Sequence, residues 1–215
     1  MIIPFKCKDK DFQEKYNEKT PQNLAHAFRM IISGTCNSGK TTYILNVLLN
    51  QKPPFDKIYL MHPTGNTSKD YELIDYELIT EMPDMESWSN ELKKIIIIDD
   101  VNYNMLNKAD KYKMDRTFGH NSSHCSLSII YACQQIYQVP RSFRSMANIV
   151  VLYKIEFRSF CDILQKLFSV DKHDAKKIRE MLKDKHDSML FDKDLLGHPH
   201  FMRKNLFEPV NYNLD

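Results

Sequence analysis

A glycine-containing segment near residue 40 has the residue types that bind phosphate. It fits the pattern G-x-x-x-x-G-K-[ST] and reads Gly34-Thr35-Cys36-Asn37-Ser38-Gly39-Lys40-Thr41. Glycines let the backbone approach phosphate oxygens closely, and successive N–H groups at the start of a helix then bind the anion. Lys40 would reach the β- and γ-phosphates, and the Thr41 hydroxyl would ligate Mg²⁺. The segment therefore predicts a nucleoside triphosphate site.

Two acids follow an apolar run later in the chain. Ile95–Ile98 leads directly into Asp99 and Asp100. In nucleotide hydrolases the first such acid holds Mg²⁺, and a second acid can orient and deprotonate the attacking water. We therefore expect Asp99 to be the magnesium residue and Asp100 the catalytic base. One strand lies between the phosphate loop and the acids, and this order, with a second acid, favours the ATPase branch that carries an additional strand.

A glutamine and two arginines could complete the reaction centre. Gln134 follows an apolar run beside the predicted acid strand, where it could sense the γ-phosphate, position the water, or only end a strand. Arg141 and Arg144 follow Pro140. An arginine near the carboxyl ends of the strands can act on the ATP of a neighbouring subunit, although a solvated surface role is the simpler alternative.

The elements that must position these residues alternate between strand and helix. At least five apolar segments read as strands, namely Phe28–Ser33, Lys57–His62, Ile95–Asp99, Leu127–Cys133 and Ile149–Tyr153. Helices are expected at 41–51, 82–94, within 102–124, at 157–170 and at 171–184, a basic loop at 137–146 and a final hairpin strand within 185–192. This alternation predicts an α/β fold with a mainly parallel sheet, whose ligand lies at the carboxyl ends of the strands. With the motifs it predicts a P-loop NTPase fold of the additional-strand (ASCE) type.

Length and composition agree with one such domain. The chain has 215 residues and a formal charge of +2, from 30 basic and 28 acidic residues. This charge excludes a strongly basic nucleic-acid coat but not a local basic patch. No apolar run is long enough for a membrane helix, and the five cysteines form no C-x-x-C pair. We expect an N-terminal arm at 1–25 and a single ATPase domain at 26–215.

Taken together, the motifs resemble those of the genome-packaging ATPases of large DNA viruses and virophages, the poxvirus type within the FtsK/HerA superfamily. The matching segments are GTCNSGKTT, which ends at Thr42, then IIIIDDV, HCSLSIIYACQ and QVPRSFRSMANIVVLYK. The family's histidine, sensor glutamine, proline and arginine correspond to His124, Gln134, Pro140 and Arg144. The chain departs from the family at Ser122-Ser123, where an Arg-Gly-Arg type of sequence is common, and at Met146, where Asn is usual.

The resemblance implies ATP hydrolysis, with ATP and Mg²⁺ as cofactors, coupled to moving double-stranded DNA into a preformed capsid. Such a motor is a ring, a hexamer or pentamer, that works with a capsid or portal-like protein without membrane insertion. Its place would be the host-cell cytoplasm, at the virus factory, and the virion. Candidates for gripping DNA phosphates follow the acid strand, namely Lys108, Lys111, Lys113 and Arg116.

Two other functions remain open on the sequence alone. A small-molecule P-loop kinase would show a lid of several arginines and a defined acceptor pocket, and Arg141 and Arg144 could imitate such a lid. A nucleotide-binding assembly factor would bind ATP without turnover. The acid pair fits attack by water better than it fits a kinase.

Overall fold

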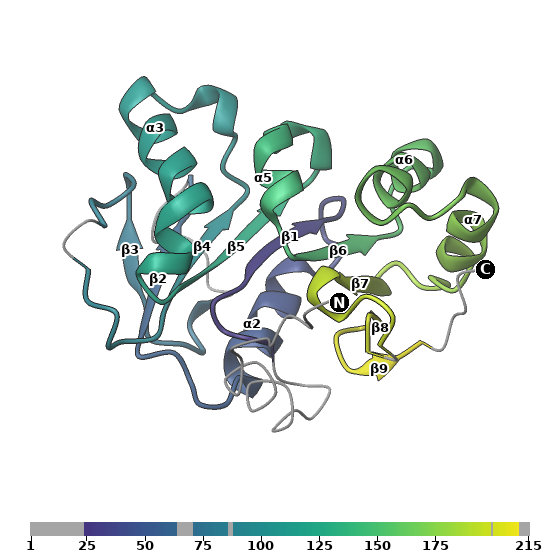
Figure 1. Ribbon diagram of the computed structural model, residues 1–215, viewed down its shortest axis with the longest axis horizontal. Coiled ribbons are helices and arrows are strands. Elements are labelled where there is room, and N and C mark those ends of the chain that lie inside the picture. The colour runs from purple at the N-terminus through teal and green to yellow at the C-terminus, as the bar shows by residue number, and fades with distance from the viewer. Residues whose placement is uncertain (1–23, 64–70, 86–87, 199, 211–215) are drawn as a thin grey trace, which may run out of the picture.

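A nine-stranded sheet forms the centre of the computed structural model, which describes residues 24–63, 71–85, 88–198 and 200–210 (Figure 1). The strands in this part of the chain are β1 (Arg29–Ser33), β2 (Lys57–Met61), β3 (Glu77–Ile79), β4 (Lys94–Asp99), β5 (Leu127–Cys133), β6 (Ile149–Tyr153), β7 (Ser188–Asp192), β8 (Met202–Lys204) and β9 (Glu208–Pro209). Their order across the sheet is β3-β2-β4-β5-β1-β6-β7-β8-β9. The first six strands in this order are parallel, and β7, β8 and β9 continue the sheet in antiparallel fashion.

The position of β5 fixes the geometry of the centre. This strand lies between β1 and β4, so that Ser33 is opposite Cys133 and Asp99 is opposite Ala132. The carboxyl ends of β1, β5 and β4 are therefore level with one another. Residues that follow these three strands must meet at one edge of the sheet, as the sequence predicts.

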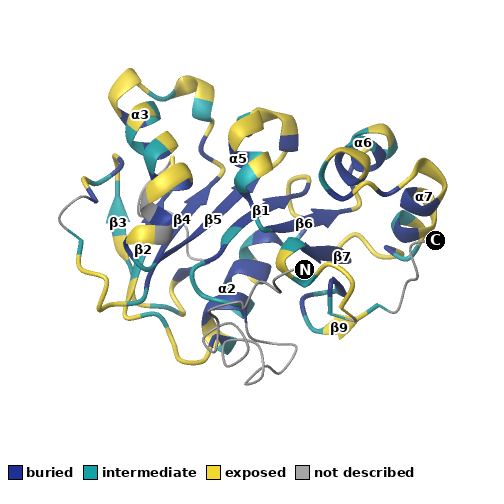
Figure 2. Ribbon diagram, in the orientation of Figure 1, coloured by how far each residue is buried: buried dark blue, intermediate teal, exposed yellow. Residues whose placement is uncertain are grey.

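Helices cover both faces of the sheet because its strands are apolar on both sides. Helix α2 (Lys40–Asn50) packs on one face, against Ile32, Ile95 and Ile97 among others. The opposite face is covered by α3 (Lys108–Arg116), α5 (Arg141–Met146), α6 (Phe157–Phe168) and α7 (Lys172–Glu180). Figure 2 shows the result, with buried strands between helices whose outer sides are exposed. No helix in the described ranges is both long and apolar enough to cross a membrane.

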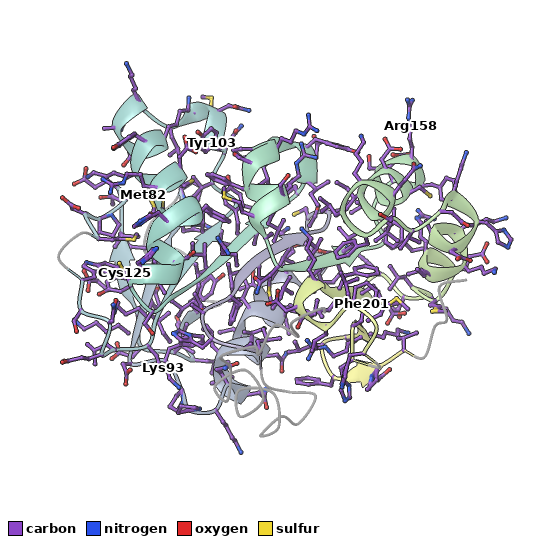
Figure 3. The ribbon with its side chains drawn as sticks, in the orientation of Figure 1. Met82, Lys93, Tyr103, Cys125, Arg158 and Phe201 are labelled. Atoms are coloured by element: carbon purple, nitrogen blue, oxygen red, sulfur yellow. The ribbon has the colours of Figure 1, made fainter. Side chains whose placement is uncertain are left out.

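An aromatic stack joins two of these covering elements. Helix α3 continues into a π-helical turn, Thr117–Asn121, which carries the fully buried ring of Phe118. Phe118 stacks on Phe143 of α5 with a centroid distance of 4.1 Å and an interplanar angle of 3°. Tyr103 meets Phe143 edge-on at 5.5 Å and is labelled in Figure 3. The segment after β4 and the segment after β5 are thus packed directly against each other.

Most predicted elements are confirmed. The five strands occur within a residue of their expected bounds, and α2, α3, α6, α7 and the antiparallel β7 occur where expected. The helix expected at 82–94 is wrong for the described residues there, which form a loop held by buried Met82 and Met85 and then the start of β4 at Lys94. The basic loop expected at 137–146 instead contains α5, because Pro140 just before its first turn needs no N–H partner. Strands β3, β8 and β9 were not predicted, and β7 is not the final strand as expected, because β8 and β9 follow it in the sheet. Of the arm expected at 1–25, residues 1–23 lie outside the described part.

Adjacent leucines of α2 give a matched test of this packing. Leu48 is 6% exposed and Leu49 is 59% exposed. We expect Leu48→Ala to lower the free energy of unfolding by about 2–5 kcal/mol, because it leaves a cavity under the sheet. Leu49→Ala should change it by no more than about 0.5 kcal/mol. Chemical denaturation measures both, and equal losses from the two variants would show that α2 does not pack on this face.

Candidate nucleotide site

The phosphate loop runs from the end of β1 to the start of α2. Gly39 has φ of 100°, a left-handed conformation that favours glycine. At Gly34 an added Cβ would lie 2.5 Å from Ser38 Oγ and 2.8 Å from the ring of Tyr153. Gly39 is therefore favoured by its backbone conformation, and Gly34 by the side chains that pack directly against it. The loop side chains of Thr35, Cys36 and Asn37 are exposed, as is that of Thr42 in α2, and Ser38 is buried.

Lys40 lies folded inside this loop. Its ammonium donates to the carbonyl oxygens of Gly34 at 3.1 Å and Thr35 at 3.3 Å. It also lies 4.0 Å from Asp100 Oδ1, and only 7% of the side chain is exposed. A buried cation needs such partners, since leaving it unpaired is costly. Lys40 is thus within the loop's concavity, between the backbone carbonyls and the acid that follows β4.

Asp99 is the buried member of the acid pair. Its Oδ2 accepts a hydrogen bond of 2.9 Å from the hydroxyl of Tyr71. Burial raises the pKa of Asp99 above its usual value, the Tyr71 hydrogen bond opposes the rise, and the neighbouring charge of Asp100 adds to it. The Asp99 carboxylate is therefore desolvated, and its protein partners compensate only in part for the lost contacts with water.

Oxygen ligands for Mg²⁺ are available from two elements. The Thr41 hydroxyl lies at the start of α2, and the Asp99 carboxylate lies at the end of β4. Both are hard oxygen donors of the kind that Mg²⁺ takes. A divalent cation would supply the counter-charge that the desolvated Asp99 lacks, so the donor set fits the metal. Bound Mg²⁺ would neutralise phosphate charge at this point.

Asp100 is turned away from the core towards the loop. It has a left-handed φ of 52°, and its N–H donates to the Ala132 carbonyl at 3.1 Å. Its carboxylate is near Lys40 and accepts a long hydrogen bond of 3.4 Å from Gln134 Nε2. The structure thus brings together Lys40, Asp100 and Gln134, which come from three parts of the sequence. An exposed carboxylate beside a glutamine amide can orient and deprotonate a water molecule.

The two arginines lie apart from this group. Arg144 donates from Nε to the Val139 carbonyl at 3.2 Å, and its guanidinium lies 5.0 Å from the ring centre of Tyr137. Arg141 is exposed on the first turn of α5. Both line a cavity of about 360 Å³ together with Lys166 of α6, and no residue of the phosphate loop lines it. This basic cavity is therefore separate from the phosphate loop in its lining residues.

Three tyrosine and histidine contacts were not predicted. The Tyr153 hydroxyl donates to the Gly39 carbonyl at 2.8 Å, and the His186 ring hydrogen-bonds the Ser38 carbonyl at 3.1 Å through Nδ1. Tyr71 adds the contact to Asp99. Tyr153 ends a predicted strand and could have been expected near the loop. Nothing in the local sequence marks His186 or Tyr71, because each reaches the site from a distant segment.

The chain also contains Asn107-Lys108-Ala109-Asp110, which fits N-K-x-D, the guanine-reading pattern of GTPases. The sequence-based prediction of an ATPase took this pattern to be absent, and that point is wrong. Asn107 is the N-cap of α3 and accepts from the Asp110 N–H at 2.8 Å. The buried Asp110 carboxylate accepts from Asn107 Nδ2 at 2.7 Å and from the Met82 N–H at 3.1 Å. The tetrapeptide therefore caps a helix, and its acid already has partners.

The loop, the acid pair and the interposed β5 define a P-loop ATPase of the additional-strand type. A family comparison gives the more specific assignment. The model of the family described as poxvirus A32 protein matches residues 15–191, and the chain belongs to this family. The resemblance to viral genome-packaging ATPases seen in the sequence is thereby confirmed. A comparison with curated proteins gives no match.

Solved structures confirm the fold. The DNA-packaging ATPase B204 from Sulfolobus turreted icosahedral virus has a TM-score of 0.58 and 15% identity, covering 86% of this chain and 98% of that one. The genome-packaging NTPase B204 from Sulfolobus turreted icosahedral virus 2, in complex with sulfate, has a TM-score of 0.59 and 15% identity. The match covers 88% of this chain and 100% of that one. The same protein in complex with ATP-gammaS has a TM-score of 0.57 and 16% identity, and the match covers 89% of this chain and 100% of that one. At these identities the likeness shows a shared fold.

The desolvation of Asp99 has a measurable effect on stability. Because burial raises its pKa, the stabilising contribution of Asp99 is present below the ordinary Asp pKa and is lost as pH rises through the folded-state value. Asp99→Asn should therefore raise Tm at pH 7.5, by about 2–4 °C if the gain is about 1 kcal/mol, and this gain should vanish towards pH 4. Thermal unfolding across pH measures it. Glu208→Gln, at an exposed carboxylate, should show no such trend. A constant gain at every pH would contradict the explanation.

Proposed function

We propose that this chain is the ATP-hydrolysing motor that moves viral double-stranded DNA into a capsid. The observation that supports it most is the meeting of Lys40, Asp99, Asp100 and Gln134 at the ends of three adjacent strands in a member of the poxvirus A32 protein family. The B204 proteins of the same fold are DNA-packaging enzymes. We assign the ATPase domain to residues 26–215 and treat residues 1–25 as an arm.

Each residue of the centre then has a role in hydrolysis. Lys40 leaves the loop carbonyls to contact the β- and γ-phosphates, while backbone N–H groups of the loop bind the same oxygens. Asp100 accepts a proton from water as the water oxygen bonds to the γ-phosphorus, and Gln134 holds that water. The bond to the β,γ-bridging oxygen breaks, and ADP leaves with the electron pair. Asp99 and Thr41 would hold Mg²⁺.

We further propose a ring, a hexamer or pentamer, in which Arg144 or Arg141 completes the site of a neighbour. The basic cavity on α5 and α6 has no lining residue from the chain's own phosphate loop, which suits action on another subunit's ATP. A small-molecule kinase would instead bring such arginines over its own phosphates. The geometry therefore favours a motor subunit over a kinase.

DNA would be gripped by the basic residues of α3. Lys108 is exposed, Lys111 and Lys113 are half-buried, and Arg116 lies over the ring of Tyr112 at 5.9 Å. A local set of cations suits binding to phosphates in a chain with a net charge of only +2. The partner that holds the ring would be a capsid or portal-like protein, and the place of action the host-cell cytoplasm, at the virus factory, and the virion.

DNA-stimulated turnover tests the proposed function. We expect the purified chain to hydrolyse ATP with Mg²⁺, and duplex DNA to increase the rate in a manner that falls steeply with salt concentration. Lys40→Ala should abolish hydrolysis because the phosphates lose their cation. Phosphate release measures both. If the chain binds ATP but does not hydrolyse it, even with DNA present and in every oligomeric state, it is instead a nucleotide-binding assembly factor.

Mixed subunits test whether an arginine acts between neighbours. Arg144→Ala should keep ATP binding and lose about 10³-fold or more in turnover. A mixture of Arg144→Ala and Lys40→Ala subunits should regain activity, because the second variant supplies an intact arginine to the intact phosphate loop of the first. Arg141→Ala in the same assay identifies which arginine acts. If neither mixture recovers activity although mixed rings form, the arginines do not act across an interface.

A further inference from the structure

The hydrogen bond from the Tyr71 hydroxyl to Asp99 Oδ2, at 2.9 Å, is a short and buried contact of the acid pair. By comparison, the Asp100 carboxylate lies 3.4 Å from Gln134 Nε2 and 4.0 Å from Lys40 Nζ. Tyr71 is 0% exposed and Asp99 is 5% exposed. A hydrogen bond between buried groups is electrostatically stronger than one in water, so this contact is a firm one.

The ring of Tyr71 is fixed by the packing of its own segment. Ile74, Tyr76 and Leu78 pack with Tyr71 on the α2 side of the sheet, and the acidic residues between them are exposed. This alternation leads into β3, the edge strand of the sheet (Figure 1). The Tyr76 ring meets the Tyr71 ring edge-on at 6.1 Å, and the Tyr71 carbonyl accepts from the Ile74 N–H at 3.2 Å. The Tyr71 hydroxyl is therefore held at a fixed place beside the end of β4.

An aspartate carboxylate needs such a fixed partner to have a defined orientation. Its terminal torsion, χ2, is broad and roughly two-fold, so the staggered rotamers of the side chain do not set the plane of the two oxygens. The bond from Tyr71 to Oδ2 sets this plane for Asp99, and Oδ1 then has a defined direction as well. Because Mg²⁺ demands near-ideal octahedral geometry, the orientation of a carboxylate that holds it affects its affinity.

Tyr71 also supports the charge of Asp99 without cancelling it. Burial raises the pKa of Asp99, and the hydrogen bond from Tyr71 opposes the rise by stabilising the ionised form. A phenol hydroxyl carries no charge of its own, so the carboxylate keeps its attraction for a cation. Partners that hydrogen-bond a metal-binding side chain are typically worth about 10- to 100-fold in metal affinity or activity.

We propose that Tyr71 is a positioning residue for the metal site, which fixes the plane of the Asp99 carboxylate so that it holds Mg²⁺ in one orientation. This inference rests on the proposed ATPase function, which assigns Asp99 to Mg²⁺. It goes beyond that function by adding a residue from the segment before β3. The edge of the sheet thereby contributes to a site that is otherwise built at the ends of β1, β4 and β5.

Metal affinity in the presence of ADP tests the inference. Mn²⁺ replaces Mg²⁺ in the assay because it takes the same oxygen ligands, and electron paramagnetic resonance measures its free concentration. Tyr71→Phe keeps the ring and its packing but removes the hydroxyl. It should raise the Kd of Mn²⁺ for the ADP complex about 10- to 100-fold. The affinity for ADP in EDTA, measured by isothermal titration calorimetry, should be unchanged because the phosphate loop is intact.

The matched control is Tyr76→Phe, which removes a tyrosine hydroxyl from the same packed segment and should alter neither affinity. Thermal unfolding of both variants separates packing from positioning. If Tyr71 serves only in packing, Tyr71→Phe lowers Tm and leaves the Kd of Mn²⁺ unchanged, and the inference is overturned. Equal losses of Mn²⁺ and ADP affinity would also overturn it, since they would show damage to the whole site.

The wild-type chain distinguishes this inference from the proposed function. If its ADP complex binds no Mn²⁺, the metal role of Asp99 and the positioning role of Tyr71 are both wrong, while the phosphate loop stands. If the chain does not bind ADP at all, the proposed ATPase function itself fails, and the inference fails with it.

Discussion

The placement of one buried ammonium group, that of Lys40, is the constraint on which the site depends. A cation with 7% of its side chain exposed needs partners, and it finds two carbonyl oxygens of the loop and a carboxylate at 4.0 Å. The loop can close around it only because Gly34 has no side chain and Gly39 has a left-handed backbone. Phosphate oxygens would replace the carbonyls as partners, so the free state already holds the cation where the anion binds.

The pleat of β4 determines where the two acids lie relative to Lys40. Alternate residues of this strand face opposite sides, so Ile95 and Ile97 pack on the α2 side while Ile96 and Ile98 pack under α3 and α5. Asp99 continues the α2 side and remains buried, and the left-handed turn at Asp100 directs the next carboxylate towards Lys40. Since β5 lies between β4 and β1, Gln134 emerges between the acids and the loop. Three strand ends at one level therefore place three different functional groups within one centre.

The sequence predicted the parts of the fold and site that local patterns control. The phosphate loop and the paired acids are runs of adjacent residues at the ends of strongly apolar strands, so their order and position could be inferred. The contacts of Tyr71 with Asp99 and of His186 with Ser38 join residues 28 and 148 positions apart, and no local pattern marks them. The segment 82–94 was expected to be a helix, but its described residues before β4 form a loop that tertiary contacts hold, among them the hydrogen bond from the Met82 N–H to Asp110. The short strand β3 likewise depends on its neighbour β2 more than on its own residues.

The Phe118–Phe143 stack has a mechanical consequence. The two rings are nearly parallel, with centroids 4.1 Å apart, and both are fully buried, so there is little free volume for one to move without the other. Phe118 belongs to the turn that extends α3, and Phe143 belongs to the helix that carries Arg144. A displacement of α5 would therefore displace α3 as well, with little of the movement absorbed by side-chain rearrangement. In the proposed ring, this coupling would transmit a change at a subunit interface beside α5 to the DNA-gripping residues proposed on α3.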